Sequence, residues 1–185
     1  MTNRYLTGHL PLFSILLFSL SFSLYGQSFM TSFLEEHGIY GGMVDFFSEN
    51  GIRLALLFVF MLAFFMLFSA LKLIADTIFS LSMLFFSKDD EGGLWQKVRS
   101  GTWIYLGASG LSLVAVQEIF FIVAIFLAAS LGYLLYVIYK IADALTVTGL
   151  IGFVSFHLLF WATFIFSTMF IVIRLYNSFI ASLPL

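Results

Sequence analysis

Four ionisable side chains interrupt otherwise apolar stretches of this sequence. Lys72 and Asp76 are one helical turn apart, so they could form a buried ion pair or an ordinary pair at a helix surface. Glu118 follows Gln117 in the middle of one apolar run, and His157 lies deep within another. A buried histidine could relay protons or hydrogen-bond a neighbouring helix. Together, the four residues are the candidate polar site for a small transporter or channel subunit.

The amino-acid composition indicates whether water or lipid surrounds these residues. The chain has 185 residues, of which 62% are apolar and 10% are charged. Soluble domains are about half apolar and about a quarter charged, so this sequence has too few charges to cover a water-facing surface. The net charge of −2 argues against nucleic-acid binding, which needs a basic patch. We find no P-loop, metal-ligand cluster or cofactor motif. The sequence therefore predicts an integral membrane protein whose partner is the lipid bilayer, with no cofactor.

The longest apolar run extends from Thr102 to Lys140 and is interrupted only by Gln117 and Glu118. As one helix it would be roughly 60 Å long, about twice the thickness of the hydrocarbon core. Folding back at Gln117–Glu118 gives five spans, whereas a single tilted helix gives four long helices. A charge at the bilayer centre costs on the order of 3 kcal/mol, and folding back brings Glu118 to an interface.

We therefore predict an all-α, polytopic membrane helix bundle with five transmembrane helices, and four long helices as the alternative. It would form a single domain over residues 1–185, with spans at about 8–28, 52–74, 102–117, 119–139 and 150–174. The first apolar run follows only one firm positive charge, Arg4, and Leu24-Tyr25-Gly26 is a poor cleavage site. We therefore expect an uncleaved first span rather than a signal peptide.

The loops predict the orientation. Residues 87–101 contain Lys88, Lys97 and Arg99, whereas residues 27–51 contain four acids and no Lys or Arg. By the positive-inside rule the first of these loops and the N-terminus are cytoplasmic. Basic cytoplasmic loops attract anionic lipid, although the acids at 89–91 weaken that attraction here.

Small residues indicate where helices pack closely. Ala124, Ala128 and Gly132 recur at four-residue spacing and form a ridge that lets another helix approach. Residues 107–112 are also mostly small, so the two arms of the folded-back segment could form a tight hairpin. The same ridges would suit a homo-oligomer or a larger membrane complex.

The run Gly107-Ala108-Ser109-Gly110 resembles the nucleophile motif of rhomboid intramembrane proteases. That resemblance implies a serine activated by a later histidine, here His157. However, His157 lacks the small neighbours of a rhomboid histidine, no earlier helix supplies the expected His and Asn, and five spans fall short of the six-helix core. A protease is therefore a remote alternative, and we predict no catalytic residues.

Several short runs spread along the chain resemble the YufK-like family of uncharacterised multi-pass membrane proteins of Bacillus and its relatives. They are residues 4–8, 50–56, 69–73, 84–88, 104–107 and 175–178. The resemblance implies a bacterial plasma-membrane location, and it supplies no activity or site. Our first functional hypothesis is a non-enzymatic helix-packing or accessory component, with the transporter or channel subunit as the alternative.

Overall fold

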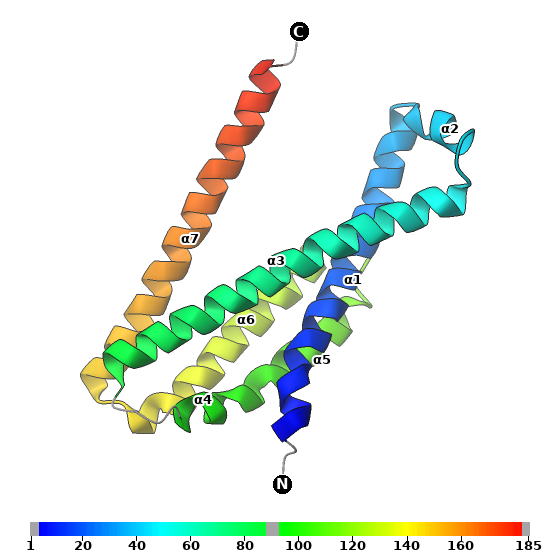
Figure 1. The fold of residues 1–185 in the computed structure, drawn as a ribbon. Helices are drawn as coiled ribbons and strands as arrows, with labels where there is room; N and C mark the ends of the chain where they lie inside the picture. The colour runs from blue at the N-terminus through cyan, green and yellow to red at the C-terminus, as the bar shows by residue number, and fades with distance from the viewer. Residues whose placement is uncertain (1–3, 88–92, 183–185) are drawn as a thin grey trace. The chain divides into compact units, whose positions relative to one another are not determined.

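The structure is a computed structural model that describes residues 4–87 and 93–182, and these residues form helices joined by short connections (Figure 1). Lys88 and the acids at 89–91 of the basic loop lie outside the described residues. The elements are α1 (Arg4–Glu36), α2 (Ile39–Val44), α3 (Glu49–Phe86), α4 (Gly93–Val98), η1 (Arg99–Gly101), α5 (Thr102–Ser112), α6 (Ile119–Ile141), η2 (Ala142–Ala144) and α7 (Val147–Ser182).

Four of the described helices are long and apolar enough to cross a membrane, which confirms the predicted polytopic helical fold. They cover Gly8–Glu36, Glu49–Phe86, Ile119–Ala144 and Val147–Ala181. Three of them run well past the predicted ends of their spans, including α7, which continues to Ser182. Helix α1 continues to Glu36, and α3 continues through the apolar residues 77–86, which contain no Gly or Pro to stop a helix.

The Thr102–Lys140 stretch folds back at its polar dipeptide. Helix α5 ends at Ser112, backbone N–H groups of Val114, Ala115 and Glu118 then donate to carbonyls three residues earlier, and α6 begins at Ile119. Helix α5 has 11 residues, about 16 Å of helix, and so is not among the four long helices. The count of long helices thus matches the four-helix alternative, while the reversal at Gln117–Glu118 matches the five-span prediction.

The chain groups into two compact units. Unit 1 comprises Met1–Ala75 and Gly92–Ile141, and unit 2 comprises Asp76–Glu91 and Ala142–Leu185. Helix α3 therefore contributes its first part to unit 1 and its last part to unit 2.

Aromatic side chains fill the centre of unit 1. Phe18 and Phe22 of α1, Phe68 of α3 and Ile122 of α6 are buried together. The rings of Phe18 and Phe126 meet edge to face with centroids 5.3 Å apart. Such pairs contribute beyond the area they bury, so they help to fix how the three helices meet.

Contacts along the helices of unit 1 define their relative register. Helix α1 and the segment that contains η1 and α5 run parallel, because Gly8 lies against Arg99 and Ser21 against Ser112, both pairs 91 residues apart. Helix α3 runs antiparallel to α1. Its residues 60, 64 and 68 meet Gly26, Phe22 and Phe18 in turn.

Helix α6 returns antiparallel to α5. The Tyr105 hydroxyl donates to Ser130 Oγ at 3.2 Å, and Ser100 Oγ lies 2.6 Å from the Tyr136 hydroxyl. Figure 1 shows α5 and α6 as the two arms of this hairpin, with α1 beside them. The level of a residue in α3, in the η1–α5 segment or in α6 can therefore be given by the residue of α1 that lies beside it.

In unit 2 the end of α3 packs against the start of α7 through a notch made by two glycines. A Cβ added at Gly149 would lie 2.7 Å from the Phe86 carbonyl oxygen, and one added at Gly152 would overlap the Phe86 ring. The Phe79 and Phe153 rings pack edge to face beside this notch, 6.0 Å apart.

We predict that Gly149→Ala lowers the free energy of unfolding by about 1 to 3 kcal/mol, because the new methyl group meets backbone rather than a movable side chain. Thermal unfolding in detergent, followed by circular dichroism, measures the change. Gly107→Ala is the matched control, since a Cβ there meets no atom within 4 Å. Equal stability of the two variants would show that the notch is not closely packed.

Candidate functional site

The register of unit 1 separates its charges, apart from Lys72, into two groups with an apolar band between them. Arg99 is level with Gly8 of α1, and Val116 and Gln117, next to Glu118, line a groove with Tyr25, Ser28 and Phe29, which places the hairpin tip about level with Gln27. The 19 residues between these positions correspond to about 29 Å of helix, close to the ~30 Å hydrocarbon core. Unit 1 thus has the dimensions of a membrane-spanning bundle with its polar groups at the two surfaces.

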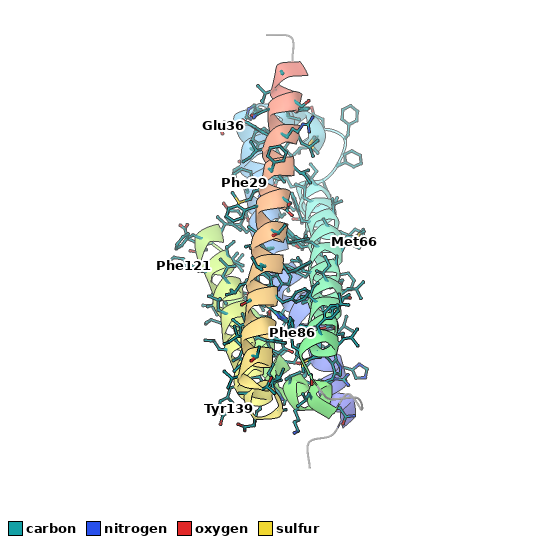
Figure 2. All side chains as sticks on the ribbon, turned by 90° about the vertical axis from the view of Figure 1, so that its left-hand side faces the viewer. Phe29, Glu36, Met66, Phe86, Phe121 and Tyr139 are labelled. Carbon is teal, nitrogen blue, oxygen red and sulfur yellow. The ribbon has the colours of Figure 1, made fainter. Side chains whose placement is uncertain are left out.

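The two ends of unit 1 carry opposite charge. Among the described residues of unit 1, all acids lie at the end that contains the tip of the α5–α6 hairpin, which we call the acidic end. They are Glu35, Glu36, Asp45, Glu49 and Glu118. Lys97, Arg99 and Lys140 lie at the other end, which we call the basic end. In Figure 2, Glu36 and Tyr139 mark these opposite ends. Arg53 lies at the acidic end, where it interacts electrostatically with Tyr40, Glu49 and Glu35.

The structure does not gather Lys72 and Glu118 at one point. Lys72 is one turn beyond Phe68 on α3, and Phe68 meets Phe18, so Lys72 is about level with Ser14. Glu118 is exposed at the hairpin tip. The two are therefore roughly 20 Å apart along the bundle. Lys72 lies about 9 Å from the level of Gly8, a distance that its long side chain can largely cover by snorkelling.

Asp76 and His157 belong to unit 2. Asp76 and Lys72 are both half-buried, and each side chain has an interaction partner. His157 is buried, with its Nδ1 3.0 Å from the Phe153 carbonyl oxygen and its ring against the Phe153 ring. His157 thus forms its hydrogen bond within its own helix.

Ser109, the nucleophile in the protease alternative, has no exposed surface. Its hydroxyl donates to the Leu106 carbonyl at 2.9 Å, and its own carbonyl accepts a hydrogen bond from Ser112. An activated serine needs a free path to a substrate carbonyl and a base that accepts its proton. Within unit 1, Ser109 has neither.

The sequence did not indicate the row of buried hydroxyls on α1. Ser14, Ser19, Ser21 and Ser23 are all buried, and each donates to a backbone carbonyl of its own helix. Serines at these positions leave room for close helix packing and satisfy themselves in apolar surroundings. The signal was present as a run of serines in an apolar segment, but helical spacing alone does not reveal which face is covered.

One of these serines also links two helices. Ser21 Oγ lies 2.8 Å from Ser112 Oγ of α5, while Ser21 also contacts the Leu17 carbonyl and Ser112 the Ser109 carbonyl. Each hydroxyl has a single proton, so two protons serve three contacts. When one serine donates its proton to the other, that proton is no longer available to the backbone carbonyl of its own helix. The small residues expected to close the α5–α6 hairpin thus include one, Ser112, that joins α5 to α1.

The predicted ridge on α6 lies mostly outside the packed interior. Ala124 and Ala128 are exposed, and a Cβ added at Gly132 would touch Ile104 at 3.8 Å. The buried face of α6 carries other residues, namely Ile122, Ala129, Val137 and Ile141.

Two surface grooves of unit 1 are open rather than enclosed. One is apolar and lies between α1 and α3. The other lies beside the hairpin tip and is lined by Tyr25, Ser28, Phe29, Ser32, Val116 and Gln117. No group of three or more His, Cys, Asp or Glu that could hold a metal ion occurs among the described residues.

Apolar helices of spanning length, with charges at the two ends of a ~30 Å band, define a polytopic helical membrane protein. The chain belongs to DUF5366, a family of unknown function, whose match covers residues 27–184. It is 48% identical over 184 residues to the uncharacterised membrane protein YufK of Bacillus subtilis (strain 168), with both chains covered in full. No solved structure matches it. The family resemblance seen in the sequence is therefore confirmed.

We predict that Ser21 and Ser112 stabilise the fold jointly. In a double-mutant cycle of Ser21→Ala, Ser112→Ala and the double variant, the coupling energy should be about 0.6 kcal/mol and at most about 2 kcal/mol, as for other hydrogen bonds between membrane helices. Unfolding by denaturing detergent measures it. A cycle of Ser28→Ala with Ser112→Ala is the control, because Ser28 bonds only within α1, and coupling of equal size there would refute the assignment.

Proposed function

We propose that this protein is a non-enzymatic component of the bacterial plasma membrane that acts by packing with further membrane helices. The supporting observation is the closed interior of unit 1. Its centre is filled by aromatic rings, and its buried serines are hydrogen-bonded within the helices. A transport path or a catalytic centre would instead need polar groups that converge on space open to water.

The orientation is part of this proposal. The end of unit 1 with the excess of Lys and Arg also holds the start of α1, and such ends face the cytoplasm in membrane proteins. We therefore place the N-terminus in the cytoplasm and the hairpin tip with Glu118 outside.

Small residues exposed on α6 suggest where another helix packs. Ala124 and Ala128 lie one turn apart on a face of α6 that unit 1 leaves uncovered. Small side chains allow two helix backbones to approach closely, so this face suits a second copy of the chain.

The alternative, a small transporter or channel subunit, requires Lys72, Asp76, Glu118 and His157 to border one water-filled space. The separation of Lys72 from Glu118 in register and the internal hydrogen bond of His157 favour the packing role over this alternative.

Single cysteines in this cysteine-free chain test the orientation and the transport alternative together. A membrane-impermeant maleimide should label Glu118→Cys in intact cells and Lys140→Cys only after the cells are permeabilised. Ser21→Cys, which is buried, is the negative control. Lys72→Cys should stay unlabelled because its position lies within the apolar band. The reverse pattern at 118 and 140 would overturn the orientation, and labelling at 72 would support a water-filled path.

Cysteine crosslinking tests self-association. We predict that Ala128→Cys forms a disulfide-linked dimer in oxidised membranes, because a symmetric contact at a small residue brings the two sulfur atoms close together. Leu127→Cys is the control, since residue 127 is also exposed but about 100° around the helix. Equal crosslinking at both positions, or none at 128, would contradict packing of two copies through this face.

A further inference from the structure

The basic end of unit 1 is built from two elements that the structure holds together. The Ser100 and Tyr136 hydroxyls are 2.6 Å apart, and a Cβ added at Gly101 would lie 2.5 Å from the Tyr136 ring. Glycine at 101 therefore allows Tyr136 to pack directly on the backbone of η1. On the next turn of α6, Lys140 Nζ lies 5.6 Å from the Tyr136 ring centroid and 5.7 Å from that of Tyr139.

Cations from three elements lie at this end of unit 1. Lys97 and Arg99 come from α4 and η1, Lys140 comes from the last turn of α6, and all three are exposed. Among the described residues of unit 1, every acid lies at the opposite end. No carboxylate of the described part of unit 1 lies at this end; Asp143, three residues after Lys140, belongs to unit 2, and the acids at 89–91 lie outside the described residues.

The depth of this cluster matches that of lipid headgroups. Arg99 is level with Gly8, where the apolar band of unit 1 ends. Trp95, Trp103 and Tyr139 lie at the same end, and Trp and Tyr side chains favour the headgroup region. A guanidinium binds a phosphate through two parallel hydrogen bonds, and an ammonium adds a point charge. Because Ser100 donates to the Lys97 carbonyl and Tyr136 to Ser100, the two hydroxyl oxygens can accept a hydrogen bond from a glycerol hydroxyl.

We propose that Lys97, Arg99 and Lys140, with the Ser100–Tyr136 hydroxyl pair, form a binding site for the headgroup of an anionic phospholipid such as phosphatidylglycerol. The occupant is a bilayer lipid rather than a soluble anion, because the cluster borders the apolar band and its Trp and Tyr neighbours favour the headgroup region of a bilayer. The site goes beyond the packing role and does not depend on which way the protein is inserted.

Tryptophan quenching in nanodiscs tests the site. In a Trp161→Phe background, Trp95 and Trp103 at the basic end are the remaining fluorophores. The protein is placed in phosphatidylcholine nanodiscs that contain a fixed minor fraction of either brominated phosphatidylglycerol or brominated phosphatidylcholine. We expect an association constant about fivefold or more higher for the anionic lipid, from attraction on the order of 1 kcal/mol for each basic residue.

The preference should disappear in Lys97→Gln/Arg99→Gln/Lys140→Gln and persist in Arg53→Gln, which removes a charge at the acidic end. High salt should also abolish the preference for the anionic lipid in the protein without these three substitutions, so the test remains valid if the triple variant fails to fold. Free glycerol phosphate in excess should not compete; competition would show that the site takes a soluble anion instead. Equal quenching by the two brominated lipids, or a preference that survives the triple substitution, would overturn the proposal.

Discussion

The structure depends on keeping charge out of a band about 29 Å thick. Helices α1, α3 and α6 pass through that band in unit 1, α5 enters it as the shorter arm of the hairpin, and all the charged groups of these segments in unit 1 except Lys72 lie at or near the segment ends. This requires the reversal between α5 and α6, because a straight continuation would carry Glu118 into the interior of the bilayer at a cost of several kcal/mol. The aromatic centre around Phe18 and Phe68 then holds the segments in the register that aligns their apolar parts.

Buried serine side chains inside the band form hydrogen bonds within their own helices. The buried serines of α1 and α5 return their protons to backbone carbonyls one turn earlier, so they need no water and no distant partner. Two of them also reach a neighbouring helix: Ser21 pairs with Ser112 of α5, and Ser23 Oγ lies 3.9 Å from the Met61 sulfur of α3. This explains how a segment with many hydroxyls remains compatible with lipid, and why its serines give no sign of catalytic activation.

Much of the fold was predictable because it follows from composition and run length. The apolar runs indicated the long helices, and the break at Gln117–Glu118 was predicted from the cost of burying one carboxylate. The ends of helices were not predictable in this way. Helices α1 and α7 continue to Glu36 and Ser182, past the predicted ends of their spans at 28 and 174, because the length of a helix is not limited by the thickness of the apolar band.

The candidate polar residues show the limit of the sequence most clearly. Ionisable type and position identified Lys72, Glu118 and His157, and four-residue spacing identified Ala124 and Ala128. Only the tertiary structure decided which of them meet, because helical periodicity defines faces but not the partner of each face. The register of the helices did so here: it separated Lys72 from Glu118, left the alanines exposed and joined Ser112 to Ser21. It also placed Lys97, Arg99 and Lys140 at the same end of unit 1, where Gly101 contacts Tyr136.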